Sequence, residues 1–203
     1  MTASPEIGGG DIQTTRPLAS FAAGLNHNDT PSEAREVARQ CLLDVLGVTI
    51  AGAHEPLVEM LAAEAEEAGG AEQATVIGRG FKTSAQQAAL VNGSAAHALD
   101  YDDVLKAMTG HPTVPVYPAL LALAEKEGLS GRDVVTAFIA GVEVEARIGA
   151  MMSSGHYAKG WHSTGTIGTF AAAAAAGRLL GLDDEAMARA LGIAGTQAAG
   201  LKS

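Results

Sequence analysis

Two short segments hold nearly all the side chains of this sequence that could do acid/base chemistry. The first covers residues 92–103 (NGSAAHALDYDD) and is followed by His111. His97 and Asp100 are three residues apart, so they share one face if this segment is helical. Three carboxylates lie where such a helix should end: Asp100, Asp102 and Asp103. A carboxylate near the negative end of a helix dipole, or near a like charge, has a raised pKa and can exchange protons near neutral pH. The segment therefore predicts an acid/base site, and the alternative is an Asp-rich exposed loop.

The second segment covers residues 155–166 (GHYAKGWHSTGT) and contains the only tryptophan of the chain, Trp161, beside His162. A helix is expected to begin just after it, at Ser163 or Thr164. The free N–H groups of a helix N-terminus can bind a carboxylate of a substrate. The alternative interpretation is an aromatic plug followed by a capping hydroxyl.

The polar residues do not have the spacing of a metal or cofactor site. His97, Asp100, Asp102, His111 and His162 could supply ligands, but no HxxxH or HExxH pattern is present. The single cysteine, Cys41, excludes a Cys-based zinc site and an internal disulfide framework. Residues 78–80 (GRG) follow a short strand but lack the later glycines of a dinucleotide-binding fingerprint. We therefore expect no metal and no organic cofactor.

The elements that must position these side chains are predicted to be helices. Residues 30–33 (TPSE) have the pattern of a capping box, and Ser130 with Asp133 and residues 182–185 open two further helices. Residues 74–78 form the only convincing strand, which is too short to build a sheet by itself. We find no repeat at a fixed period. The sequence predicts an all-α helical bundle with at most one short strand or hairpin.

Composition excludes several classes of protein. The chain has 203 residues, 13 Lys and Arg against 23 Asp and Glu, and a formal net charge of −10, which argues against nucleic acid as a partner. It is 47% hydrophobic with 25 glycines, so helices rich in small residues must approach closely to bury a core. Residues 1–15 have neither the basic nor the apolar region of a signal peptide and are expected to form a disordered lead-in. No stretch is apolar enough to cross a bilayer, so we expect a cytoplasmic protein with no membrane partner.

The two polar segments, together with several apolar motifs, resemble the MmgE/PrpD family, which includes 2-methylcitrate dehydratase, cis-aconitate decarboxylase and iminodisuccinate epimerase. The resemblance extends over nearly all of residues 17–203. The matching stretches are residues 43–48, 51–52, 92–103, 111–112, 141–144, 147–149, 160–168, 171–182 and 191–195.

The resemblance implies a fold, a partner and a chemistry. Family members have a large all-α domain joined to a smaller α/β lid, usually as homodimers, so residues 16–203 would be the N-terminal helical domain with the lid missing. They act on small di- and tricarboxylates by proton abstraction next to a carboxylate, without metal or organic cofactor. Asp100, His111 and His162 match active-site residues of the family. We assign Asp100 and one histidine to acid/base catalysis and the other histidine to binding a substrate carboxylate. Further substrate-binding candidates are His97, Ser163 and Thr164.

Departures from the family pattern limit what the resemblance implies. Val104 stands where the decarboxylase has a threonine, and the spacing from Asp103 to His111 is one residue longer, so cis-aconitate decarboxylation is expected less than another activity of the family. We expect a dehydratase acting on a substrate such as 2-methylcitrate. Family members are more than twice as long, and their catalytic-lysine motif would begin beyond Ser203. We therefore expect an incomplete family member, inactive by itself. The alternatives are an isomerase, epimerase or decarboxylase of the same family, and a helical module that only dimerises.

Overall fold

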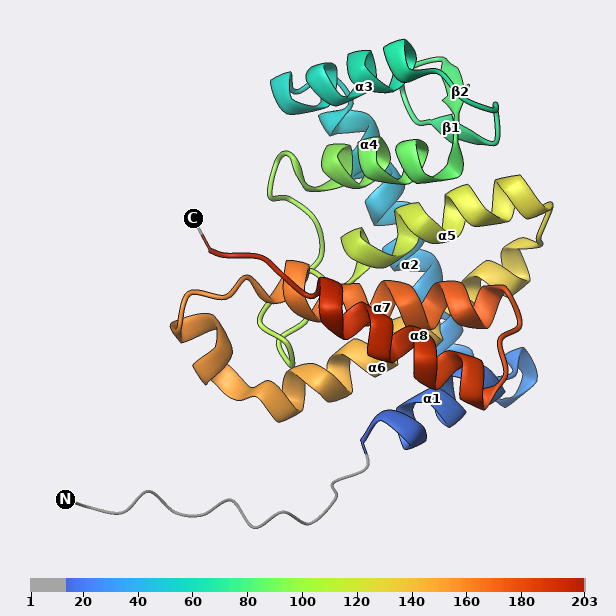
Figure 1. Ribbon diagram of the computed structural model, residues 1–203, viewed down its shortest axis with the longest axis vertical. Helices are drawn as coiled ribbons and strands as arrows, with labels where there is room; N and C mark the ends of the chain where they lie inside the picture. The colour runs from blue at the N-terminus through green and yellow to red at the C-terminus, as the bar shows by residue number, and fades with distance from the viewer. Residues whose placement is uncertain (1–13, 203) are drawn as a thin grey trace.

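The computed structural model describes residues 14–202, with Ser153 and Ser154 described by their backbone alone. Most of this part is helical, as the sequence predicts (Figure 1). The elements in chain order are α1 (Thr15–Gly24), η1 (His27–Asp29), α2 (Ser32–Gly52), α3 (Pro56–Ala68), β1 (Ala74–Val76), β2 (Phe81–Thr83), α4 (Ala85–His97), α5 (Thr113–Glu127), α6 (Gly131–Ala158), α7 (Ser163–Leu179) and α8 (Asp184–Gln197). Of the lead-in expected over residues 1–15, residues 1–13 lie outside the described part. Thr15 already begins α1.

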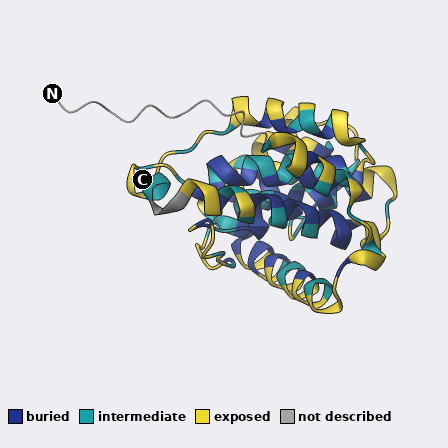
Figure 2. Ribbon diagram, turned by 90° about the horizontal axis from the view of Figure 1, so that it is seen from below, coloured by how far each residue is buried: buried dark blue, intermediate teal, exposed yellow. Residues whose placement is uncertain are grey.

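The main core lies where α2, α5, α6 and α7 meet. Leu120 and Phe138 are buried there, with Val45 from α2 and Ala171 from α7. Helix α7 packs against α5, α6, α8 and α1, so it is the central helix of this half of the bundle. Helices α3 and α4 and the hairpin stand at the opposite end from α1 and α6 (Figure 1). Buried residues occupy the inner faces of the helices, and the exposed ones face outward (Figure 2).

Small residues let the helices approach as closely as the composition predicts. A methyl group added to Gly141 of α6 would lie 2.8 Å from the carbonyl oxygen of Ala171 in α7. One added to Gly168 of α7 would lie 2.6 Å from a ring carbon of Pro115 in α5. Backbone contacts of this kind fix α7 against α5 and α6, and the start of α7 carries part of the site described below.

The expected strand is half of a hairpin. Strands β1 and β2 pair antiparallel, with Ala74 opposite Thr83 and Val76 opposite Phe81. Asn92 of α4 is buried against the hairpin, where its side chain accepts a hydrogen bond from Ile77 N–H and donates one to the Thr75 carbonyl. This asparagine therefore has a structural function, and it ties α4 to the hairpin.

Two of the local predictions have different outcomes. The helix start predicted at Ser130 is confirmed, and Ser130 and Asp133 form a capping box at the start of α6. The capping box expected over residues 30–33 is wrong, because α2 begins at Ser32 with Pro31 before it and no side chain caps the helix. The hydroxyl of Thr30 donates to the Asn26 carbonyl instead, and the hydroxyl of Ser32 donates to Glu33.

No single helix within residues 14–202 has both the length and the apolar character needed to cross a membrane. The pair α2 and α3, bent by 88°, meets that criterion by length and composition only.

Candidate active site

The two polar segments meet in space, although His111 and His162 lie 51 positions apart in the sequence. His97 is the last residue of α4, His111 lies just before α5, and His162 immediately precedes α7. The ring centroids of His97 and His111 are 4.9 Å apart, and those of His97 and His162 are 5.9 Å apart. Three imidazoles from three parts of the chain therefore form one cluster.

Asp100 lies at the turn by which the chain leaves α4. Its φ is +49°, a left-handed conformation that aspartate tolerates better than most residues. Its N–H donates to the His97 carbonyl at 3.1 Å, which closes the turn. The side chain is 81% exposed, and its Oδ1 lies 3.3 Å from Nε2 of His111. Asp100 thus stands at the solvent side of the cluster, free to move relative to His111.

Asp102 lies at the inner side of the same cluster, with a side chain only 1% exposed. Nδ1 of His97 is 3.0 Å from its Oδ1 and 3.1 Å from its Oδ2. Nδ1 of His111 is 3.3 Å from Oδ2 of the same carboxylate. The sequence places Asp102 in the acid/base segment, but nothing in the spacing showed that it would contact two histidines.

Asp103 belongs to the start of the next helix. Its Oδ2 accepts a hydrogen bond of 2.5 Å from the Thr113 hydroxyl, and its Oδ1 accepts one of 3.3 Å from Thr113 N–H. The expectation that the three aspartates lie at the negative end of a helix dipole is therefore wrong for Asp103. This carboxylate accepts hydrogen bonds at the N-terminus of α5, where the helix dipole favours a negative charge. Burial raises the pKa of Asp103, and the hydrogen bonds from Thr113 oppose that shift.

His162 is held by the segment that follows α8. Its N–H donates to the Gly200 carbonyl at 3.0 Å, and Trp161 and Leu201 form an antiparallel bridge beside it. Trp161 stacks on His156 with centroids 6.2 Å apart and is 42% exposed. The tryptophan is thus partly exposed and is not an enclosed plug.

The predicted substrate-binding residues at the start of α7 have different surroundings. Helix α7 begins at Ser163, as expected, but the Ser163 side chain is buried. The hydroxyl of Thr164 accepts a hydrogen bond of 3.0 Å from His111 N–H and also lines a cavity. Thr164 therefore links the loop of residues 98–112 to α7, and substrate binding by either residue stays a prediction.

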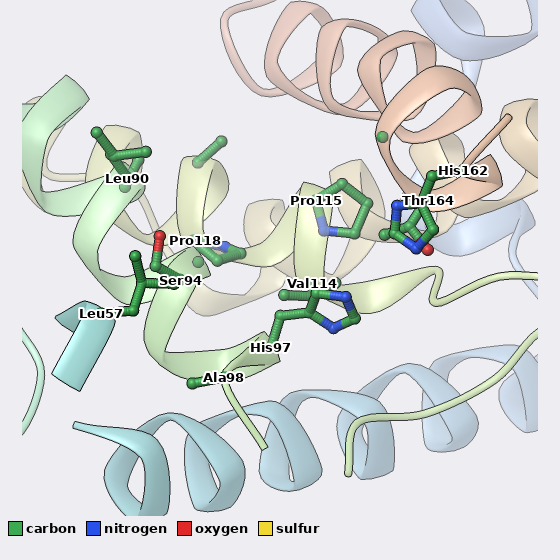
Figure 3. Close-up of a pocket in the computed structure, with 14 residues that line it drawn as sticks. Leu57, Leu90, Ser94, His97, Ala98, Val114, Pro115, Pro118, His162 and Thr164 are labelled. Atoms are coloured by element: carbon green, nitrogen blue, oxygen red, sulfur yellow. The ribbon is translucent and has the colours of Figure 1, made fainter. Parts of the chain in front are cut away.

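Two cavities adjoin the histidine cluster. The larger, of about 450 Å³, is mostly apolar and contains His97, His162 and Thr164 among its lining residues (Figure 3). Its apolar wall includes Leu57, Leu90, Pro115 and Pro118 (Figure 3). The smaller, of about 330 Å³, is lined by His111, His162, Lys106, Thr109, Gly110, Val104 and Tyr157. His162 borders both cavities. Lys106 and Tyr157 are polar lining residues that the sequence analysis missed: Lys106 belongs to no motif, and Tyr157 lies in the second polar segment but was not singled out there.

The surroundings favour opposite charge states for two of the histidines. The hydrogen bond to Asp102 raises the pKa of His97, against the opposing effect of burial. Burial lowers the pKa of His162, and the neighbouring His97 and His111 lower it further. The surroundings therefore favour the protonated form of His97 and the neutral form of His162, and acid/base catalysis can use one imidazole of each kind.

Four of these side chains could approach a metal ion. One ligand atom from each of His97, Asp100, Asp102 and His111 can be chosen so that all lie within 4.8 Å of one another. The sequence analysis names these four residues, with His162, as conceivable ligands, although their spacing matches no ligand motif. However, both oxygens of Asp102 already contact Nδ1 of His97, and Nδ1 of His111 also contacts the Asp103 carbonyl. The arrangement is that of a hydrogen-bonded network, and independence from metal stays a prediction.

Comparison with known proteins matches the whole described part of the chain. Residues 16–203 match the model of the MmgE/PrpD N-terminal domain. The chain is 37% identical over 197 residues to a cis-aconitate decarboxylase of Aspergillus terreus, covering 93% of this chain and 40% of that protein. It is 35% identical over 195 residues to the cis-aconitate decarboxylase-like protein oryM of Aspergillus oryzae, covering 92% and 40%. It is 32% identical over 186 residues to a cis-aconitate decarboxylase of Mus musculus, covering 89% and 38%. The chain thus spans about 40% of the length of these curated relatives.

Proposed function

Because the chain belongs to the MmgE/PrpD family, we propose that it is the N-terminal helical part of a cofactor-independent lyase acting on a small di- or tricarboxylate. The observation that carries the proposal is the cluster of His97, His111 and His162, with Asp100, at the junction of two cavities. The relatives are lyases by name, and the clustered groups are those that proton transfer needs.

The smaller cavity supplies the groups that suit a carboxylate substrate. Lys106 and His111 line it together with His162, so one substrate carboxylate can pair with the lysine ammonium while another accepts a hydrogen bond from an imidazole. Neutral His162, at the junction of the cavities, is then within reach of a carbon next to a carboxylate. The apolar wall of the larger cavity would exclude water from the reacting carbon.

Two lyase reactions fit this arrangement. In a dehydration, an imidazole removes the proton next to a carboxylate, a carbon–carbon double bond forms, and hydroxide leaves the adjacent carbon as water after protonation by Asp100 or an imidazolium. In a decarboxylation, the carbon–carboxylate bond breaks, carbon dioxide leaves, and an imidazolium protonates the carbon. Val104 and the longer loop before His111 favour dehydration of a substrate such as 2-methylcitrate.

Decarboxylation of cis-aconitate is the second candidate. It is supported by the names of the relatives, which are 32–37% identical over most of this chain. Val104 lines the smaller cavity and is 70% exposed, so the residue that departs from the decarboxylase pattern lies where a substrate would bind. Epimerase or isomerase activity would need the same proton abstraction without a leaving group. A helical module that only dimerises would need none of these groups.

The first experiment measures binding to the purified chain. Citrate, cis-aconitate and 2-methylcitrate are titrated into protein with ¹⁵N-labelled histidine, and butyrate serves as the monocarboxylate control. We expect the ring signals of His111 and His162 to move with tricarboxylates and not with butyrate. His162→Gln should weaken this response, whereas His54→Gln, at an exposed histidine that lines neither cavity, should not. No response at about 10 mM ligand, where a Kd of about 1 mM would give near-saturation, would contradict the proposal.

The second experiment measures turnover and distinguishes the candidates. Residues 1–203 are fused to the remaining part of the Aspergillus terreus relative, and products are identified by NMR. Loss of water from 2-methylcitrate would support the dehydratase, and loss of carbon dioxide from cis-aconitate the decarboxylase. In the active fusion, His111→Gln should lower the rate by about 10²–10⁴-fold, while His54→Gln should leave it unchanged. The unfused chain should turn over little, since a missing transition-state donor costs about 10²–10³-fold. A homodimer is part of the proposal, and sedimentation of the fusion would test it.

A further inference from the structure

The carboxylate of Asp102 is the one acidic group that two members of the cluster share. Its side chain is almost completely buried, and it faces Nδ1 of His97 at 3.0 and 3.1 Å and Nδ1 of His111 at 3.3 Å. A carboxylate loses its hydration when it is buried, and this loss destabilises the folded chain unless the carboxylate accepts hydrogen bonds there. Both histidines therefore have to present N–H groups to it, which sets which ring nitrogen carries the hydrogen.

For His111 a second contact gives the same assignment. Its Nδ1 lies 3.0 Å from the carbonyl oxygen of Asp103, and a carbonyl can only accept. Nδ1 must therefore carry the hydrogen whether or not Asp102 contributes. His97 has no such second acceptor among residues 14–202, so the assignment of its hydrogen to Nδ1 depends on Asp102 alone.

We propose that Asp102 is a positioning residue, which holds the hydrogen of His97 on Nδ1 and shares that function for His111 with the Asp103 carbonyl. Nε2 of each ring is then the nitrogen left for chemistry. For His97, Nε2 has no hydrogen-bond partner within the described part, and the residue lines the larger cavity beside His162. For His111, Nε2 faces the exposed Asp100, which a substrate group could displace. The use of the two Nε2 atoms in catalysis rests on the proposed function. The assignment of the ring hydrogens to Nδ1 rests on the geometry alone.

A purely structural function would leave a different signature. If Asp102 only filled space in the loop, neither the tautomers of the two histidines nor the pKa of His97 would depend on its charge. If it positions them, its charge should act more strongly on His97 than on His111, because His111 keeps the Asp103 carbonyl. The other charged groups near His97 are Asp100, whose charge raises the pKa of His97, and His162.

The test uses the 203-residue chain without substrate, so its result does not depend on the proposed activity. Long-range ¹H–¹⁵N NMR of labelled histidine identifies the protonated nitrogen of each ring. In the unmodified chain, above the pKa of each imidazole, we expect His97 and His111 to carry hydrogen on Nδ1, the less common form of free histidine in water. Hydrogen on Nε2 of His97 would overturn the proposal, and this measurement needs no variant to fold.

The second part of the test titrates Asp102→Asn beside Asp29→Asn, which makes the same charge change at an exposed aspartate in η1. Asp102→Asn should lower the pKa of His97, and His111 should keep its hydrogen on Nδ1. Asp29→Asn should leave both rings unchanged. A His97 pKa that moves no more in Asp102→Asn than in Asp29→Asn would overturn the proposal.

Discussion

The close contact between Gly149 and the loop that carries His111 leads to a quantitative prediction for Gly149→Ala. The added methyl carbon would lie 2.5 Å from Cβ and 2.6 Å from Cα of Met108, and 3.0 Å from the Ala107 carbonyl oxygen. Overpacking costs about 1–3 kcal/mol. We expect a cost in the upper half of this range, because the backbone atoms that the methyl group meets cannot rotate away. Replacing glycine by alanine within a helix recovers about 0.5–1 kcal/mol. The net loss of about 1–2.5 kcal/mol should lower Tm by about 2–10 °C for a chain of this size.

Gly47→Ala in α2 is the matched control, since a methyl group there meets no atom within 4 Å. It should gain about 0.5–1 kcal/mol, which raises Tm by about 1–4 °C. Thermal unfolding followed by circular dichroism measures both variants. A Gly149→Ala variant as stable as Gly47→Ala would refute the reasoning, because it would mean that α6 and the loop do not pack as closely as described.

Three further predictions concern charge, capping and metal. Burial raises the pKa of Glu145 well above its usual 4.5. The bound proton therefore stabilises the folded chain fully below about pH 4.5, and this stabilisation is lost as the pH rises through the raised pKa. Glu145→Gln should therefore unfold in urea with a weaker dependence on pH between 5 and 8 than the unmodified chain, and equal dependence would count against this. Asp183→Ala should lower the free energy of unfolding in urea by about 0.5–2 kcal/mol, because the Asp183 carboxylate accepts a hydrogen bond of 2.8 Å from Ala186 N–H at the start of α8. Asp184→Ala, which removes no such bond, should lower it by less. The reverse order would contradict the capping assignment. Removal of divalent ions with EDTA should leave helicity and citrate binding unchanged, and binding lost with EDTA but restored by zinc would show that the His97 cluster needs a metal.

Helix positions could be predicted where the signal is local. Ser130 and Asp133 cap each other across one turn, so four residues of sequence suffice to place the start of α6. Residues 30–33 offer a similar set of hydroxyl and carboxylate side chains. However, the Thr30 hydroxyl donates to the Asn26 carbonyl and the Ser32 hydroxyl donates to Glu33, so neither caps the helix. Competition of this kind depends on how the preceding turn folds, which the local pattern does not contain.

The residues of the site could be predicted, but the contacts between them could not. Asp100, His111 and His162 were identified from motifs, and the structure brings them together. That Asp102 is buried between two rings, whereas Asp100 two residues away is exposed, follows from the left-handed turn at Asp100. Asp103 bonds the start of a helix ten residues further on. Neither arrangement has a signature in the spacing of the aspartates.

The 50 residues between His111 and His162 have a consequence for how the site forms during folding. They include all of α5 and α6, two long helices that must pack before α7 can bring His162 to the other rings. Closing a loop of this length costs entropy that only the contacts of the packed helices can offset. The histidine cluster should therefore form late, together with the core of α5, α6 and α7, so that a partly folded chain with α4 alone in place would contain His97 and Asp102 but no complete site.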